Sequence, residues 1–336
     1  MQSTHTAPFV LDTAPLLTPA ADPTETALLR VNDVIRQRLS SRVALIDQIA
    51  HYIISAGGKR IRPRLVLLFA EALGFEGPES FELAAIVEFI HTATLLHDDV
   101  VDESALRRGR ATANATFGHA ARVLVGDFWY SRAFQMMVSV NRMRVLDVLA
   151  DATNVIAEGE VLQLMNMHDP DLSVADYLQV IRFKTAKLFE ASARLGAVLA
   201  GAGPAVEESC ADYGRSLGTA FQLVDDLLDY EGKSAELGKN VGDDLREGKP
   251  TLPLLLAMER GTAQERAMIR HAIEQGELHK LPEILVVVER TGALQATRAA
   301  AQEEADRARL ALAALPDSRA RQALLDLCVR SVHRSS

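Results

Sequence analysis

An apolar helix that ends in a cluster of acids is the feature that most constrains this chain. Residues 81–96 have the spacing of a largely buried helix, and Asp98, Asp99 and Asp102 follow it; we call these three the first acid motif. If the helix continues to Asp102, Asp98 and Asp102 lie one turn apart on one face, together with His91. Crowded carboxylates repel each other and are costly to leave uncompensated. A cation such as Mg²⁺ removes that cost, because it takes oxygen ligands and shares them with substrate phosphates.

Two arginines, Arg107 and Arg108, stand just after the first acid motif. A guanidinium group grips phosphate oxygens through paired hydrogen bonds. The acids, the cation and the arginines together predict a site for a diphosphate.

The acid pattern recurs later in the chain as Asp225, Asp226 and Asp229, the second acid motif. Gln222 falls one turn before the Asp pair, so a polar stripe follows one side of this predicted helix. Acids at helical spacing usually mark a solvated helix face, and one motif alone does not decide between the two interpretations. Two copies, each within apolar sequence, favour a metal-dependent diphosphate site.

The composition predicts a nearly all-α protein with a large core. The chain has 336 residues, 48% of them hydrophobic, and β-branched alternation is scarce. A net charge of −9 argues against binding to nucleic acid. Cys210 and Cys328 form no disulfide framework and fit a reducing compartment. No apolar run is long enough for a transmembrane segment and no secretory signal is evident, so we expect a cytoplasmic protein.

The chain is expected to consist of a tail and one helical domain. Residues 1–22 are rich in Pro, Thr and Ala and have no period, so they are predicted to be a flexible N-terminal tail. Residues 23–336 show no linker and are predicted to form a single domain. Helices are expected at 23–39, 41–54, 126–140, 146–167 and 176–199, with further helices and no clear chemistry from 252 to 336.

A basic turn follows the glycine pair at 57–58. Lys59 and Arg62 stand beside Pro63, which can begin a helix, and the N–H groups of a helix N-terminus attract anions. This turn therefore predicts an anion site. Taken alone, a basic turn is more often simply solvated surface.

Four further polar residues are candidates for binding an anionic substrate. Lys184 and Thr185 lie in a mostly apolar predicted helix, where a lysine can also extend to solvent. Lys239 and Lys249 lie in a glycine-rich segment that could close over a substrate.

The order and spacing of these motifs resemble the trans-isoprenyl (polyprenyl) diphosphate synthase family, and most of all its bacterial octaprenyl diphosphate synthases, which make the quinone side chain. The resemblance runs from about residue 25 to the C-terminus. It rests on GGKRIRP at 57–63, EFIHTATLLHDDVVDES at 88–104, ATAN at 111–114, AEGEVLQLMN at 157–166, KTA at 184–186, GTAFQLVDDLLDY at 218–230, GKNVGDD at 238–244 and GKPTLPLL at 248–255. No motif is broken, and only the N-terminal tail lies outside the pattern.

The resemblance implies a role for each matching residue. The implied ligands of about two or three Mg²⁺ ions are Asp98, Asp99, Asp102, Asp225 and Asp229. Asp226, Arg107 and Lys184 join these acids as implied catalytic residues. The implied contacts of the allylic diphosphate are Arg107, Lys184, Thr185, Gln222, Lys239 and Lys249. Those of isopentenyl diphosphate are Lys59, Arg62, His91 and Arg108.

The resemblance also implies a fold, a reaction and an assembly. The fold is an isoprenoid synthase bundle of roughly a dozen helices around a central cavity, usually in a homodimer. The reaction is Mg²⁺-assisted ionisation of an allylic diphosphate such as farnesyl diphosphate, followed by attack of the alkene of isopentenyl diphosphate. The product passes to the membrane.

Three alternatives to a long-chain synthase remain. A class I terpene cyclase typically carries an Asn/Ser/Glu metal triad in place of a second acid motif, so the second motif argues against it. A non-catalytic partner subunit tends to lose acid motifs, and both are intact here. A shorter-chain synthase of the geranylgeranyl type has the same motifs.

Product length is predicted to depend on residues one turn before the first acid motif. Thr94 lies about 40° around the helix from Asp98, whereas Ala93 lies about 140° away. The family makes both positions gates, and short-chain members place an aromatic residue there. Both residues are small here, which predicts an open tunnel and a long product. Met136 or Met137 is a candidate for the tunnel floor, although paired methionines are more often core packing.

Overall fold

The computed structural model describes residues 23–55, 58–101, 106–107, 110–111, 118–231 and 241–334. These residues are helical apart from short connections and one antiparallel pair of two-residue strands, β1 (Leu106–Arg107) and β2 (Arg110–Ala111). The predicted all-α class is confirmed. The expected tail at 1–22 lies outside the described residues. No helix in the described part of the chain is long and apolar enough to cross a membrane.

The first half of the bundle is built around α4. Its helices are α1 (Glu25–Leu39), α2 (Ala44–Ser55), α3 (Ile61–Ala72), α4 (Glu79–Val101), α6 (His119–Val140) and α7 (Met143–Asn166). Because α1, α3, α6 and α9 (Lys187–Leu199) all pack against α4, its middle is apolar on every side, and Leu83, Ile86 and Phe89 are fully buried. Helices α6 and α7 begin earlier than the sequence predicted, at His119 and Met143.

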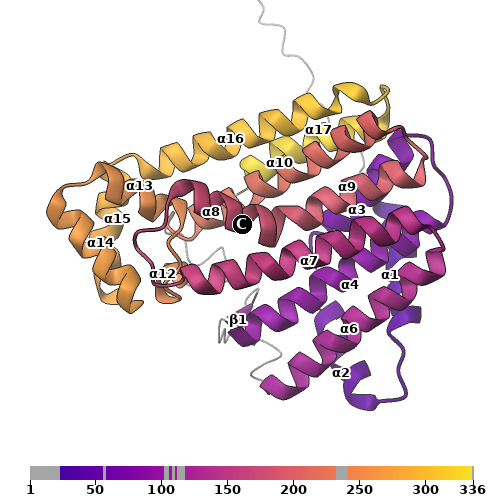
Figure 1. Ribbon diagram of the computed structural model, residues 1–336, viewed down its shortest axis with the longest axis horizontal. Helices are drawn as coiled ribbons and strands as arrows, with labels where there is room; N and C mark the ends of the chain where they lie inside the picture. The colour runs from indigo at the N-terminus through magenta and orange to yellow at the C-terminus, as the bar shows by residue number, and fades with distance from the viewer. Residues whose placement is uncertain are drawn as a thin grey trace, which may run out of the picture.

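The second half is built around α10, a 25-residue helix that begins with Pro204 at its first turn. The remaining elements are α8 (Val174–Ile181), α10 (Pro204–Leu228), α12 (Asp243–Arg246), α13 (Leu252–Arg260), α14 (Ala263–Gln275), α15 (Leu281–Arg290), α16 (Ala293–Ala311) and α17 (Arg319–Val332), with short 3₁₀ turns at Leu278–Lys280 and Leu312–Ala314. Helix α10 packs against α9 and α16, while α13, α14 and α15 form the far end of the molecule (Figure 1).

The helix predicted at 176–199 is helical throughout but is not a regular α-helix, which corrects the prediction. A π-helical turn, Arg182–Ala186, separates α8 from α9. Two glycines let neighbouring helices approach this turn closely. A Cβ atom added at Gly159 of α7 would lie 2.6 Å from the backbone nitrogen of Lys184. One added at Gly218 of α10 would lie 2.6 Å from the Cα atom of Ala186. The π turn is therefore held between two helices at the position of Lys184 and Thr185, as is frequent at functional sites.

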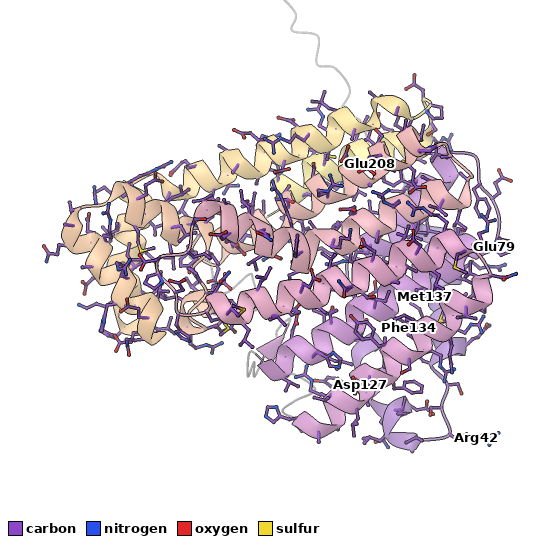
Figure 2. All side chains as sticks on the ribbon, in the orientation of Figure 1. Arg42, Glu79, Asp127, Phe134, Met137 and Glu208 are labelled. Atoms are coloured by element: carbon purple, nitrogen blue, oxygen red, sulfur yellow. The ribbon has the colours of Figure 1, made fainter. Side chains whose placement is uncertain are left out.

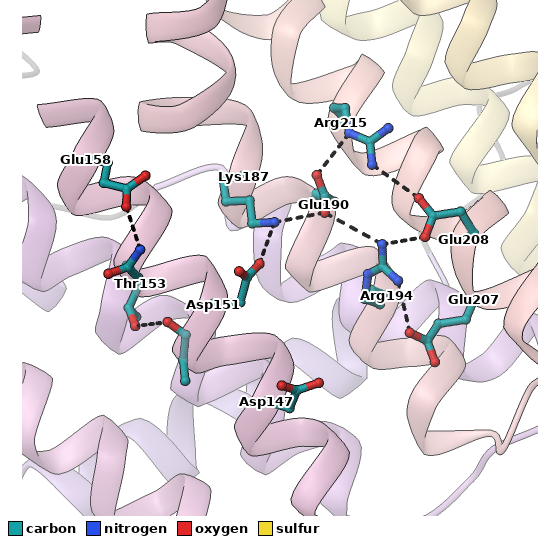
Figure 3. Close-up of polar contacts among 12 residues, drawn as sticks. Asp147, Asp151, Thr153, Glu158, Lys187, Glu190, Arg194, Glu207, Glu208 and Arg215 are labelled. Atoms are coloured by element: carbon teal, nitrogen blue, oxygen red, sulfur yellow. Dashed lines mark hydrogen bonds and ion pairs between the residues drawn. The ribbon is translucent and has the colours of Figure 1, made fainter. Parts of the chain in front are cut away.

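An ionic network joins α7, α9 and α10 (Figure 3). Glu190 is its centre: one carboxylate oxygen accepts from Lys187 at 3.1 Å, and the other accepts from Arg215 at 3.0 Å. Lys187 also contacts Asp151 of α7 at 2.8 Å, and Arg194 contacts Glu208 of α10 at 2.8 Å. The network fixes the relative position of the three helices that carry the π turn and its glycine contacts.

Candidate active site

The first acid motif lies at the end of α4, and its first member faces the π turn. The carboxylate of Asp98 is 3.6 Å from the ammonium of Lys184. That ammonium also donates to Glu160 of α7 at 2.5 Å. His91, Thr94 and Asp98 are all partly exposed. Asp102 lies outside the described residues.

Asp99 faces in a different direction from Asp98. Its side chain is buried and forms an ion pair with Arg122 of α6, which is itself 1% exposed. Burial lowers the pKa of Arg122 to about 10, so the guanidinium stays charged at neutral pH. Asp99 thus joins α4 to α6, whereas the resemblance implied a metal ligand at this position.

The three members of the second acid motif, at the end of α10, also have different environments. Asp225 is partly exposed, and its carboxylate is 2.8 Å from the guanidinium of Arg334 near the C-terminus. Asp226 is 4% exposed and accepts hydrogen bonds from Tyr177 and Gln222. Asp229 accepts from two backbone N–H groups at the start of α12, at 3.2 and 3.1 Å, and so caps that short helix.

The basic turn and α4 together form a cationic group. Arg62 lies 3.1 Å from the Nε2 atom of His91 and stacks 4.5 Å over the ring of Phe189. Burial lowers the pKa of Arg62 to about 10, while the charges of Glu88 and Asp225 oppose that shift. Arg62 therefore remains a cation near neutral pH and lies within electrostatic reach of the second acid motif. Lys59, at the entrance to the turn, is exposed.

A chain of hydrogen bonds connects the π turn to the second acid motif. The hydroxyl of Thr185 donates to the Gln222 carbonyl oxygen at 3.0 Å, and the Gln222 amide donates to Asp226 at 2.8 Å. Because Lys184, the neighbour of Thr185, faces Asp98, the π turn lies between the two acid motifs. The structure thus brings together Asp98, Lys184, Thr185, Gln222 and Asp226, which the sequence placed far apart.

The electrostatics of the site suit a divalent cation. Burial and the charge of Asp98 raise the pKa of Glu160 to about 7. Burial and the charges of Asp244 and Asp225 raise that of Asp226 to about 7. Both shifts come first from burial and then from neighbouring carboxylates, so a cation placed between these acids would favour their charged forms. The described residues contain no group of three His, Cys, Asp or Glu side chains arranged as a metal site, but Asp102 is not among them.

Several predicted site residues are placed elsewhere or are not described. The side chain of Arg107 and the whole of Arg108 and Lys239 lie outside the described residues. Lys249 follows α12 and pairs with Glu247 at 2.5 Å. The proposed chain-length residues Ala93 and Met137 are both buried in the core between α4 and α6.

Three residues at the site were missed by the sequence analysis. Glu160 lies in the AEGE part of the segment 157–166 that resembles the family. An acid next to a glycine in an otherwise apolar helix could have marked it as a site residue. Tyr177 gave no signal, because an aromatic residue in a helix usually means core packing. Arg334 gave none either, since nothing local shows that the C-terminus returns to α10. The guanidinium of Arg334 stacks 3.8 Å over the ring of Phe221 and donates to the Phe221 carbonyl oxygen at 2.5 Å.

Comparison with known proteins identifies the family. The profile described as polyprenyl synthetase matches residues 43–287. The chain therefore belongs to the polyprenyl synthetase family and is a prenyltransferase.

Individual relatives match over most of their length. The chain is 58% identical to the octaprenyl diphosphate synthase of Escherichia coli (strain K12), over 90% of this chain and 94% of the relative. It is 46% identical to the all-trans-nonaprenyl-diphosphate synthase (geranyl-diphosphate specific) of Rhodobacter capsulatus, over 88% of this chain and 91% of the relative. A crystal structure of polyprenyl synthase from Caulobacter crescentus CB15, complexed with calcium and isoprenyl diphosphate, superposes with a TM-score of 0.90 at 48% identity, covering 93% of this chain and 96% of that one.

Proposed function

We propose that the protein is a long-chain trans-polyprenyl diphosphate synthase of the octaprenyl type, which supplies the side chain of a quinone. The observation that carries this proposal is the polar chain from Asp98 through Lys184, Thr185 and Gln222 to Asp226, which joins the two acid motifs. Similarity to the octaprenyl synthase of Escherichia coli supports the product class. The absence of bulky residues at Ala93 and Thr94 supports a long product.

The residues at the site suit both the metal and the two diphosphates. Asp98 and Asp225, with Asp102, are the acids proposed to hold Mg²⁺, and the polyprenyl synthase of Caulobacter crescentus was crystallised with calcium and isoprenyl diphosphate. When bound, Mg²⁺ supplies positive charge next to the departing diphosphate. Lys184 and Gln222 are proposed to contact the allylic diphosphate. Arg62 and His91, with Lys59 and Arg108, are proposed to bind isopentenyl diphosphate.

The reaction follows from where these charges lie. The bond between the allylic carbon and the diphosphate oxygen breaks, and the electron pair leaves with the diphosphate. Lys184 and Gln222 stabilise that developing negative charge, because they are already fixed at the π turn and α10. The alkene of isopentenyl diphosphate then forms the new carbon–carbon bond. The released diphosphate takes the proton that the adduct loses, and this loss restores an alkene.

We further propose that residues 23–336 act as a single domain and that the protein is a cytoplasmic homodimer. The cysteines Cys210 and Cys328 are both free and buried, which supports a reducing compartment. The dimer is supported by exposed apolar side chains on the consecutive helices α6 and α7, Phe134 of α6 among them (Figure 2). We call these residues together the α6–α7 face; they are Leu124, Phe134, Val138, Val161, Leu164 and Met165.

One incubation tests the proposed function. The protein is mixed with Mg²⁺, radiolabelled isopentenyl diphosphate and farnesyl diphosphate, and the products are extracted into butanol and separated by chromatography. The expected product is a chain of about eight isoprene units, in line with the open gate positions. No extractable product would refute the enzyme assignment, and a product of about four units would support the geranylgeranyl alternative.

A further inference from the structure

The carboxylate of Asp226 is held inside the protein by two donors. It is 4% exposed, and each of its oxygens accepts one hydrogen bond. One comes from the phenol of Tyr177 on α8 at 2.5 Å, and the other comes from the Gln222 amide at 2.8 Å. Tyr177 is itself 4% exposed, so water does not replace its hydrogen bond readily.

These contacts determine which way the amide of Gln222 points. In the structure the amide nitrogen of Gln222 faces Asp226 and donates to it, while the carbonyl oxygen of Gln222 accepts from the hydroxyl of Thr185. An amide nitrogen carries two N–H groups, and Asp226 takes one of them. Gln222 is partly exposed, so its second N–H is available to a phosphate oxygen.

Tyr177 and Thr185 belong to one continuous helical segment, because α8 runs directly into the π turn. Two hydrogen bonds therefore connect this segment to α10. One runs from Tyr177 to Asp226, and the other runs from Thr185 to Gln222, one turn earlier on α10. Without the phenol, Asp226 has one donor left and is free to rotate, and Gln222 loses the fixed acceptor that orients it.

On the basis of the proposed function, we propose that Tyr177 is a positioning residue for diphosphate departure. Its phenol fixes Asp226, and Asp226 fixes Gln222, so that one amide N–H points at the allylic diphosphate. Tyr177 itself touches no substrate in this arrangement.

The test is Tyr177→Phe, which removes only the hydroxyl. A hydrogen bond to a charged group contributes about 1.5–3 kcal/mol, so we expect kcat to fall by about tenfold or more. The KM for isopentenyl diphosphate should stay within about twofold, because Arg62 and His91 are untouched. Binding of the non-ionising analogue farnesyl thiolodiphosphate with Mg²⁺, measured by calorimetry, should weaken by about fivefold or more.

The matched control is Tyr213→Phe. Tyr213 is fully buried on α10, and its hydroxyl donates to the Leu324 carbonyl oxygen at 2.7 Å. It lies twelve residues before Asp225, which is about 18 Å along the helix. We expect this variant to lose thermal stability and to keep the kinetics and analogue binding of the wild type.

A double-mutant cycle with Gln222→Ala distinguishes positioning from a general structural role. If Tyr177 acts through Gln222, the double variant should be no slower than Gln222→Ala alone. Losses that multiply would overturn the inference, as would a Tyr177→Phe variant that behaves like Tyr213→Phe.

If Tyr177→Phe fails to fold, Asp226→Asn serves instead. It leaves one acceptor oxygen and one NH2 group where the carboxylate offered two acceptors, so Gln222 and Tyr177 can no longer both donate to it and analogue binding should weaken. Unchanged analogue binding in Asp226→Asn would refute the inference. A wild-type protein that makes no prenyl product would refute the proposed function, whatever the variants do.

Discussion

Asp98 and Asp99 are adjacent in the sequence, but the structure gives them different tasks. Asp98 faces Lys184 at the site, whereas Asp99 is buried against Arg122. Asp98→Asn should therefore lower kcat by about a hundredfold or more without changing the melting temperature, because it removes charge needed for diphosphate departure. Steady-state kinetics and thermal unfolding measure the two effects separately.

Asp99→Asn should give the opposite result. It leaves the buried guanidinium of Arg122 without its countercharge, and breaking a buried ion pair typically costs about 3–5 kcal/mol of folding free energy. Chemical denaturation followed by circular dichroism would measure this loss. An Asp99→Asn protein of normal stability but low Mg²⁺ affinity would instead favour the metal-ligand role that the resemblance implied.

The two diphosphates should be separable by single substitutions. Arg62→Ala removes the partly buried cation beside His91 and should mainly raise the KM for isopentenyl diphosphate, by about tenfold or more. Lys184→Ala removes the cation between Asp98 and Glu160 and should mainly impair the allylic substrate. Initial rates with each substrate varied in turn would show the difference, and the reverse pattern would mean that the two subsites are exchanged.

The sequence predicted residue types at the site better than their orientations. The helix expected through His91, Thr94 and Asp98 is present as α4, and all three residues are partly exposed. Helical arithmetic could not show that Asp99 has a partner on α6, since that ion pair forms between separate helices. Arg334 was missed for the same reason, because tertiary packing alone brings it to Asp225.

At the scale of elements, the π turn is the main feature that periodicity could not predict. Apolar spacing over 176–199 favours one regular helix, but the π turn at Arg182–Ala186 lies where Gly159 of α7 and Gly218 of α10 approach it closely. Gly159→Ala should displace the π turn, because the added Cβ would lie 2.6 Å from the backbone nitrogen of Lys184. We expect both turnover and thermal stability to fall. Gly203→Ala is the control, since a Cβ there would meet nothing within 4 Å, and equal losses in both variants would contradict a specific role for the π turn.

Helix α4 also allows a test of product length. Thr94 lies on the partly exposed face with Asp98, while Ala93 is fully buried in the core shared with α6. Thr94→Phe should therefore shorten the product to about three or four isoprene units and leave the first condensations intact. Ala93→Tyr should also shorten it, and with a larger loss of stability, because the ring must displace packed neighbours. Product chromatography and thermal unfolding measure both effects, and full-length product from both variants would mean that the growing chain follows another route.

For the whole molecule, assembly through the α6–α7 face remains a prediction. Leu124 and Val138 of α6 are each 67% exposed, and Met165 of α7 is 72% exposed. The combined variant Leu124→Glu/Val138→Glu places two charges on this face, where burial in a dimer would be costly. We expect it to be a monomer of 36.6 kDa, and the wild type to have twice that mass by size exclusion with light scattering. Leu310→Glu, at a 76% exposed position on α16, is the control and should remain dimeric. A monomeric wild type would refute the dimer, and a dimeric double variant would mean that another surface of the molecule forms the interface.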